Sequence, residues 1–405
     1  MSPIRRWLSV VGIGEDGLDG LSPAARALIA QAALVVGGRR HLSLARDAIS
    51  GETLAWPSPP QAGFPAILAQ RGAPVCVLAS GDPFFYGIGS LLAQQVPPEE
   101  MVCLPGPSAF SLAASRLGWA VQDCALVTLH GRALERIIPH LQPRARILAL
   151  SWDHTTPRRL AERLAALRLG DTRMTVCEAL GGPRERLRHI LADDFALDDI
   201  DPLNLVALEL SKAPGGRVIP LTPGLPNEWF EHDGQLTKRD VRAVTLAALA
   251  PRHGELLWDI GAGSGSVGIE WMLASPACRA IAIERNGARA GRIARNAAAL
   301  GVPDLVIVEG AAPAALANLP SPDAVFIGGG ATAACVIDTA WAALKPGGRL
   351  VVNSVTIETQ AELFRRFGTM SGELRTIQVA HAVSVGGFHA MRPSLPVTLW
   401  SVTKP

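Results

Sequence analysis

The chain has few of the features that tie a protein to a nucleic acid or a membrane. Its 38 Lys and Arg residues against 36 Asp and Glu residues give a net charge of +2, so it lacks a strong field of one sign. No uninterrupted apolar run approaches the ~18 residues of a membrane-spanning helix. One tyrosine in the whole chain leaves little for stacking on bases. We therefore expect a cytoplasmic protein whose partner is a small molecule, with no nucleic acid and no membrane.

The sequence also lacks the spacing of a metal site. None of its six cysteines forms a Cys-x-x-Cys pair, and none of its nine histidines has a thiol or carboxylate partner at ligand spacing. We predict no metal and interpret the six cysteines as reduced core thiols, because Cys76, Cys103 and Cys335 lie in apolar or helix-like runs.

The length and the order of patterns predict an α/β protein of two domains. A chain of 405 residues exceeds what one core usually organises. Short β-rich runs, such as Val75–Ala79 and Leu205–Leu208, alternate with helical patterns from Leu8 to about Leu210. A second such series begins with a helical pattern at Lys238–Leu249. Prolines and glycines crowd the stretch between them, which favours a linker. The predicted parts are residues 1–211, a linker at 212–233 and residues 234–405.

A glycine-rich loop in the second part has the order typical of an adenosine site. The apolar strand Leu256–Trp258 leads into Asp259-Ile260-Gly261-Ala262-Gly263-Ser264-Gly265, and Glu284 ends the next apolar strand. Backbone amides at such a loop bind the cofactor, and the acid binds the ribose hydroxyls. The same stretch also satisfies a dinucleotide fingerprint, which keeps an NAD-dependent oxidoreductase open. Asp259 favours a cationic sulfonium cofactor, because an acid there would repel a pyrophosphate. A helix-capping Asp259 and a surface Glu284 are the structural alternatives.

A second glycine loop lies near the start, where Gly12, Gly14 and Gly17 also fit the dinucleotide spacing. Glu15 and Asp16 inside this loop argue against a bound pyrophosphate.

Four landmarks of the first part resemble the class III tetrapyrrole methyltransferases. They are the opening Val10–Gly14, the stretch Ala79–Gly87 with Gly81-Asp82-Pro83, the later Leu104–Ala109, and His130-Gly131 at a strand end. Gly81-Asp82-Pro83 is the most specific of them. The resemblance implies a bilobed fold with S-adenosylmethionine bound at Gly81, Asp82, Pro83, Phe85, Ser108 and Ala109. His130 would line the active site as a catalytic residue, with a structural histidine as the alternative. Gly12 and Gly14 would shape a tetrapyrrole trough.

The second part resembles the class I methyltransferases, with a Rossmann-like fold. The stretches Gln235–Arg242, Phe326–Gly330 and Leu344–Val352 carry this resemblance beside the glycine loop. No amide or aromatic side chain accompanies Gly328–Gly330, so a flipped base is disfavoured and a large flat substrate is favoured. The implied cofactor residues are Thr237, Asp259, Gly261, Gly263, Ser264, Gly265, Glu284, Gly310 and Ala311. The implied catalytic residues are Lys238, Arg239 and Gly329.

The two resemblances together match the family of decarboxylating precorrin-6Y C5,15-methyltransferases, over nearly the whole chain. They imply methylation of precorrin-6B at carbons 5 and 15 and loss of carbon dioxide from the ring C acetate, on the path to cobalamin. One S-adenosylmethionine per domain and a homo-oligomer are implied as well. Two further hypotheses stay open: a first domain that only binds the tetrapyrrole, and an RNA methyltransferase with an accessory domain.

The many carboxylates of such a substrate suit arginine forks and lysines. The candidates are Arg132, Arg158 and Arg217 in the first domain and Lys238, Arg239 and Arg242 in the second. A solvated surface charge is the alternative for each.

Overall fold

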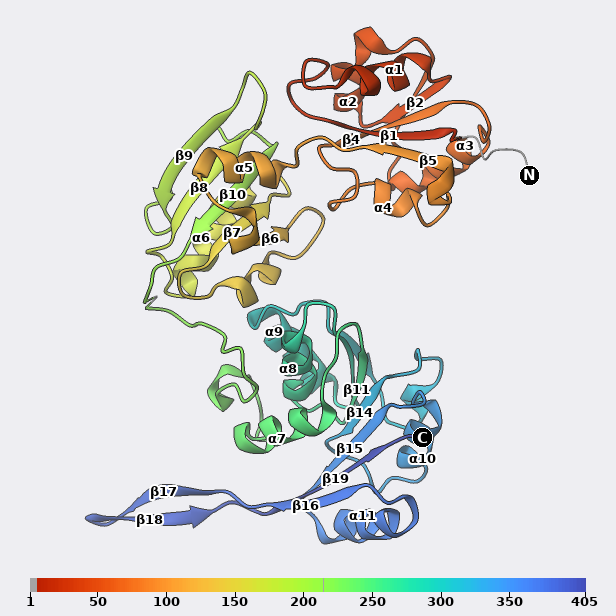
Figure 1. The fold of residues 1–405 in the computed structure, drawn as a ribbon. Coiled ribbons are helices and arrows are strands. Elements are labelled where there is room, and N and C mark those ends of the chain that lie inside the picture. The colour runs from red at the N-terminus through yellow and green to blue at the C-terminus, as the bar shows by residue number, and fades with distance from the viewer. Residues whose placement is uncertain (1–5, 214) are drawn as a thin grey trace. The chain divides into compact units, whose positions relative to one another are not determined.

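The computed structural model describes residues 6–213 and 215–405, and the chain forms two compact units (Figure 1). The first unit extends to Arg217 and the second begins at Val218, except that Glu135–Pro139 belongs to the second. Pro214, in the predicted linker, and the first five residues lie outside the described residues.

The first lobe of the first unit is a parallel sheet of five strands in the order β3-β2-β4-β1-β5. Its strands are β1 (Leu8–Ile13), β2 (Leu34–Gly37), β3 (Glu52–Ala55), β4 (Val75–Ser80) and β5 (Met101–Leu104), and its helices are α1 (Pro23–Gln31), α2 (Arg39–Leu44), α3 (Phe64–Leu68) and α4 (Gly89–Leu92).

Both faces of this sheet are buried, which is why its central strands β1 and β4 are mostly apolar. One core joins Val11 and Leu78 to Ile29 of α1, and the other joins Val10 and Val77 to Ile67 of α3. The carboxyl ends of β2, β4 and β1 therefore meet along one edge.

The second lobe is a mixed sheet in the order β6-β7-β10-β8-β9, in which only the β6–β7 pair is parallel. Its elements are α5 (Ala109–Leu117), β6 (Cys124–Thr128), β7 (Arg146–Leu150), α6 (Thr156–Ala166), β8 (Arg173–Glu178), β9 (Arg186–Leu191) and β10 (Asn204–Glu209). Phe110 of α5 packs on this sheet with Leu148 and Leu205.

The second unit is built on a sheet of seven strands in the order β13-β12-β11-β14-β15-β19-β16, in which β19 runs opposite to the other six strands. Its strands are β11 (Leu256–Ile260), β12 (Arg279–Glu284), β13 (Val306–Glu309), β14 (Ala324–Ile327), β15 (Arg349–Ser354), β16 (Glu373–Ile377) and β19 (Val397–Thr403). Its helices are α7 (Arg239–Leu249), α8 (Ser266–Ala274), α9 (Gly287–Ala299), α10 (Val336–Ala343) and α11 (Ile357–Met370). The two α/β units agree with the predicted fold class.

Residues 218–233, predicted as a linker, pack on the second unit. The backbone N–H groups of Gly224 and Leu225 donate to the buried carboxylate of Glu270 on α8, at 2.6 and 2.9 Å. Arg242 of α7 donates to the same carboxylate at 2.5 Å and to the carbonyl of Leu225. Its guanidinium also lies 4.8 Å from the ring of Phe230. A proline- and glycine-rich composition excluded regular structure here, but tertiary hydrogen bonds fix the segment.

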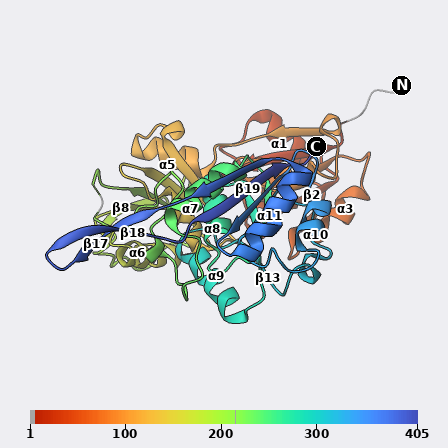
Figure 2. The ribbon, with the colours of Figure 1, turned by 90° about the horizontal axis from the view of Figure 1, so that it is seen from below.

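A two-stranded hairpin connects the end of β16 to the start of β19 and extends away from this sheet (Figure 2). It consists of β17 (Ala380–Val385) and β18 (Phe388–Pro393), and its large apolar side chains Phe388 and Met391 are 82% and 65% exposed.

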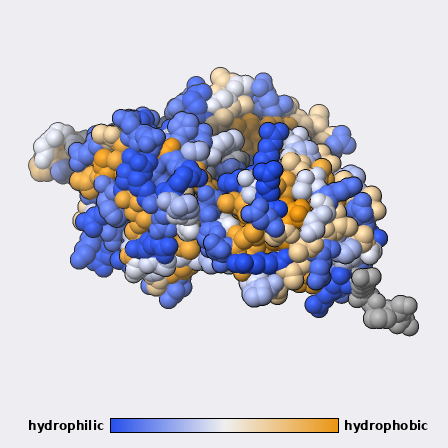
Figure 3. Space-filling view, turned by 90° about the horizontal axis from the view of Figure 1, so that it is seen from above, coloured by the Kyte–Doolittle hydropathy of each residue, from blue (hydrophilic) through white to orange (hydrophobic). Residues whose placement is uncertain are grey.

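The surface seen from above carries hydrophilic residues interspersed with apolar patches (Figure 3). No helix within residues 6–213 and 215–405 has the length and apolarity needed to cross a membrane. All six cysteines are free; Cys76, Cys177 and Cys278 are buried, whereas Cys335 is exposed, against the prediction of a core position. Cys335 directly precedes α10 at a backbone φ of +63°, and the buried residues of that helix begin only at Val336.

Candidate active sites

Three glycines bring the carboxyl ends of β1, β4 and β5 into close contact in the first unit. The N–H of Gly106 donates to the carbonyl of Gly81 at 3.0 Å, and a Cβ on Gly12 would overlap both of these residues. Gly81 has a φ of +51°, and a Cβ there would lie 2.6 Å from the carbonyl oxygen of Pro107. Only glycine allows this approach, because it has no Cβ and tolerates positive φ.

The loop after Gly81 is folded on itself by its own groups. Asp82 accepts a 2.9 Å hydrogen bond from the N–H of Phe84, and the carbonyl of Pro83 accepts one from Gly89 at 2.8 Å. Phe85 stacks on Tyr86 and lies 4.9 Å from the ring of Phe110, so this predicted cofactor residue packs between the loop and α5.

The other predicted residues of the first unit lie on the adjoining segments. Ser108 caps α5 by accepting from the N–H of Ser111 at 3.1 Å, and Ala109 is the first residue of that helix. His130 is exposed beyond the end of β6, with its ring 6.3 Å from that of Trp152 beyond the parallel strand β7. Gly81, Pro107 and Ser108 are in contact, whereas His130 lies on the edge of the second lobe.

A polar cluster that the sequence reasoning missed lies at the carboxyl ends of β1, β2 and β4. Arg40 donates to the carboxylate of Glu15, which is only 10% exposed, and to the hydroxyl of Ser80 at 3.2 Å. His41 Nε2 lies 2.9 Å from the same hydroxyl. Burial, and then the charge of Arg40, lower the pKa of His41 to about 4, so the imidazole is neutral at physiological pH. The signal was the dipeptide Arg40-His41, which Gly38 and Arg39 separate from the end of the apolar strand β2.

In the second unit the glycine loop wraps the carboxyl end of β11. Gly261, Gly263 and Gly265 all have positive φ, between +59° and +77°. A Cβ on Gly261 would lie 2.7 Å from the carbonyl of Gly329, and one on Gly263 would lie 2.9 Å from that of Gln235. The loop is therefore confined between the end of β14 and the segment that contains Thr237.

Glu284 ends β12 beside this loop and is 3% exposed. One carboxylate oxygen accepts from the N–H of Gly263 at 2.9 Å, and the other accepts from Asn286 at 3.0 Å. The N–H of Gly310 donates to the carbonyl of Glu284 at 3.0 Å, and Ala311 follows. Each carboxylate oxygen keeps a lone pair for a hydroxyl group, as an adenosine site requires.

Asp259 lies on β11 and is 1% exposed. Its Oδ2 accepts from the N–H of Gly268 on α8 at 2.9 Å, while Oδ1 has no partner among the described residues. Burial raises the pKa of Asp259 to about 7, and the nearby Glu284 adds to the rise. A buried carboxylate with an unsatisfied oxygen fits a cationic ligand group. Ser264 is also buried, and its Oγ has no partner in the described chain.

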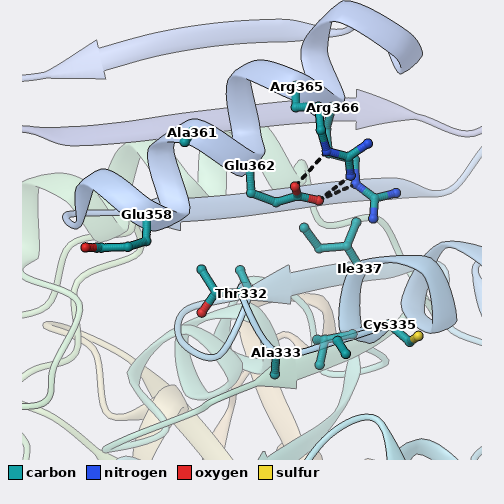
Figure 4. Close-up of a pocket in the computed structure, with 12 residues that line it drawn as sticks. Thr332, Ala333, Cys335, Ile337, Glu358, Ala361, Glu362, Arg365 and Arg366 are labelled. Atoms are coloured by element: carbon teal, nitrogen blue, oxygen red, sulfur yellow. Dashed lines mark hydrogen bonds and ion pairs between the residues drawn. The ribbon is translucent and has the colours of Figure 1, made fainter.

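A cavity of about 440 Å³ lies between helix α11 and the segment Ala331–Ile337, which begins four residues after the end of β14 (Figure 4). A Cβ on Gly329 would meet nothing within 4 Å, so this glycine borders open space. Arg365 and Arg366 donate to Glu362 at the far side, and these hydrogen bonds hold the pKa of Glu362 well below its usual range.

The basic residues predicted for the second site divide into two groups. Lys238 and Arg239 are exposed at the start of α7. Arg242 is fully buried in its pair with Glu270 and donates to the carbonyl of Thr237, so it supports the site from within and does not reach a substrate. No group of three or more potential metal ligands is found in the described parts of the chain.

Two family models divide the chain between them. The tetrapyrrole (corrin/porphyrin) methylases match residues 8–196, and the precorrin methyltransferase domain matches residues 228–404. Together with the fold, they define an S-adenosylmethionine-dependent methyltransferase that joins two methylase domains.

Three relatives refine this class. The precorrin-6Y C(5,15)-methyltransferase [decarboxylating] of Sinorhizobium sp is 54% identical over 99% of this chain and 97% of its own. A probable cobalt-precorrin-6B C(15)-methyltransferase (decarboxylating) of Saccharolobus solfataricus is 30% identical over 45% of this chain and 96% of its own. The cobalt-precorrin-7 C(5)-methyltransferase of Salmonella typhimurium is 33% identical over 44% of this chain and 88% of its own. The chain belongs to the family of decarboxylating precorrin-6Y C5,15-methyltransferases, which confirms the resemblance seen in the sequence.

Proposed function

We propose that the two units divide one overall reaction, with each binding its own S-adenosylmethionine. The overall reaction is that of the family: precorrin-6B is methylated at carbons 5 and 15, and the ring C acetate is decarboxylated, in cobalamin biosynthesis. The first unit methylates carbon 5. The second methylates carbon 15 and removes the carboxylate. Half-length relatives named for a C(5) and for a decarboxylating C(15) methyltransferase support this division.

The cofactor of the second unit would lie against the Gly261–Gly265 loop. Glu284 would bind the ribose hydroxyls, Gly310 and Ala311 would lie beside the adenine, and Asp259 Oδ1 would face the methionine ammonium. In the first unit, the amides around Gly81 and Ser108 would hold the second cofactor. The cofactor supplies an electrophilic methyl group on a sulfonium.

The protein's share of the chemistry is mainly orientation. Bridging carbons of a reduced tetrapyrrole are enamine-like nucleophiles, so methyl transfer depends on in-line placement against the sulfonium. The open space at Gly329 is the place we propose for the macrocycle edge that carries the acetate. Poor solvation of that carboxylate would favour its loss, while the conjugated ring accepts the electron pair. Lys238 and Arg239 are proposed contacts for other substrate carboxylates.

The open space at Gly329 carries this assignment, and two full-length variants test it. Gly329→Leu places a branched side chain in the proposed macrocycle site and leaves the cofactor loop intact. Gly81→Val disrupts the contact with Pro107 in the first unit. With precorrin-6B and S-adenosylmethionine, Gly329→Leu should lose carbon 15 methylation together with decarboxylation, and Gly81→Val should lose only carbon 5 methylation. Loss of the same step in both variants would contradict the division.

We also propose a cytoplasmic homo-oligomer. The six free thiols suit a reducing compartment, and class III domains are often dimeric by resemblance. The hairpin β17–β18 has two unpaired edges, and an isolated two-stranded sheet is marginally stable in water. Sedimentation of the intact chain tests the oligomer: a monomer at micromolar concentration would contradict it.

A further inference from the structure

Helix α9 supports the glycine loop of the second unit from one side. Its residue Ile293 packs so closely on the loop that a Cβ on Gly265 would lie 2.7 Å from that side chain. About one turn further along α9, Asn296 donates to the carbonyl of Ser264 at 2.9 Å. Asn296 is 2% exposed, so water does not compete for this hydrogen bond. The loop of the proposed cofactor site is thus held by α9.

Asn296 holds a second segment of the chain as well. Its Oδ1 accepts from the N–H of Glu231 at 2.8 Å, and its Nδ2 donates to the carbonyl of Glu231 at 3.0 Å. Because carbonyls face one end of the amide and an N–H faces the other, the orientation of this side chain is determined. Both amide hydrogens are used within the protein. Asn296 therefore acts on a ligand only through the two segments that it joins.

The second segment passes from α9 over the glycine loop to α7. Residues 231–237 form this strap, and a Cβ on Gly263 would lie 2.9 Å from the carbonyl oxygen of Gln235 in its middle. Lys238 and Arg239, the proposed contacts for substrate carboxylates, follow directly and begin α7. The place of the strap therefore determines where these two cations stand relative to the cofactor loop.

A second anchor of the strap lies at Asp233 and is more exposed. Asp233 Oδ2 lies 2.9 Å from a guanidinium nitrogen of Arg289 and 2.8 Å from one of Arg292, both on α9. Asp233 Oδ1 accepts from the N–H of Gln235 at 3.3 Å. The two arginines hold the pKa of Asp233 well below its usual range, so the carboxylate stays ionised. These pairs tie the strap to α9 just before it crosses the loop.

We propose that Asn296 and Asp233 are positioning residues for carbon 15 methylation. Through α9 they set the strap, and with it Lys238 and Arg239, in a fixed place relative to the loop that holds the methyl donor. In-line methyl transfer depends on this alignment, and a misplacement of about 1 Å can cost on the order of 100-fold in rate. The inference rests on the proposed function of the second unit.

Two variants of the full-length enzyme test this role, with a matched control. Asn296→Ala removes the three hydrogen bonds that join loop, strap and helix. Asp233→Asn keeps the shape of the exposed anchor and removes its charge, so it decides the question if the buried variant does not fold. Glu255→Ala is the control, because that carboxylate pairs with the buried Arg349 at the amino end of the same sheet.

Four quantities are measured for each variant. Rates at saturating precorrin-6B and S-adenosylmethionine are scored separately for carbons 5 and 15 by mass spectrometry. Cofactor affinity is measured by calorimetry, and stability by urea denaturation. The kcat for carbon 15 methylation should fall on the order of 100-fold in Asn296→Ala. It should fall roughly fivefold in Asp233→Asn, because exposed ion pairs contribute less.

The other quantities separate positioning from a merely structural role. Cofactor affinity should stay near that of the wild type, because Glu284 and Asp259 keep their places, and carbon 5 methylation should be unchanged. Glu255→Ala should lose stability and keep its carbon 15 rate. Wild-type carbon 15 rates in the two anchor variants, a loss of cofactor affinity as large as the loss of rate, or an equal rate loss in Glu255→Ala would overturn the proposal. If Gly329→Leu still methylates carbon 15, the proposed function of the second unit fails instead.

Discussion

Replacing Glu284 by Ala tests the cofactor site of the second unit most sharply. The carboxylate is buried and accepts from the N–H groups of Gly263 and Asn286, so it is rigidly placed at the end of β12. The substitution removes the proposed ribose contacts and leaves the Gly263 N–H without its partner. Hydrogen bonds to a charged group contribute on the order of 1.5–3 kcal/mol. That loss corresponds to roughly 10- to 150-fold weaker binding.

Isothermal titration of the intact chain with S-adenosylmethionine measures this effect. Two sites per chain are expected in the wild type, and Glu284→Ala should weaken one of them and leave the other unchanged. Glu373→Ala is the control, because that carboxylate pairs with Arg375 on the edge strand β16. An unchanged two-site isotherm for Glu284→Ala would refute the assignment of the ribose contact.

Three further predictions follow from buried groups and from the boundary between the units. Because the pKa of Asp259 is raised to about 7 and a cationic ligand favours its ionised form, cofactor affinity of the second site should fall as the pH drops below about 7, and Asp259→Asn should flatten this dependence in calorimetry. Glu270→Ala removes the ion-pair partner of the buried Arg242 guanidinium and should lower the unfolding free energy of the second unit by roughly 3–5 kcal/mol in urea denaturation. An unchanged urea midpoint would contradict this expectation. A chain divided after Arg217 should give two folded halves by circular dichroism, whereas a cut at Glu228 should destabilise the second half; equal stability from both cuts would contradict the packing of residues 218–233.

The sequence predicted the elements whose burial is complete. Strands such as Val75–Ala79 and Leu205–Leu208 lie buried in the middle of their sheets and are apolar runs. The helix predicted at Lys238–Leu249 begins one residue later, at Arg239, because Lys238 is its N-cap. Strands β3 and β9 were missed because they are edge strands with exposed polar side chains, and a half-exposed strand loses its apolar signature. The hairpin β17–β18 was missed because its side chains are mostly exposed, apolar ones such as Phe388 included, so no buried face imposes an alternating pattern.

The candidate sites were predictable only where the backbone itself forms them. Glycine loops leave a trace in the sequence because positive φ and close approach demand glycine, as at Gly81 and Gly261. The partners of Arg242 and Arg40 are distant in sequence, so no local pattern distinguishes a buried structural arginine from a surface one. For that reason Arg242 was counted among the substrate contacts, and the cluster of Arg40 with His41 and Ser80 was overlooked.

The mass balance of the complete reaction tests the central claim most directly. The intact chain is incubated with precorrin-6B and an excess of S-adenosylmethionine, and the product is analysed by mass spectrometry with carbon-13 labelled methyl groups. We predict two labelled methyl groups gained, at carbons 5 and 15, and one carbon dioxide lost from each macrocycle. A product that gains only one methyl group, or that gains two and keeps its ring C acetate, would contradict the account.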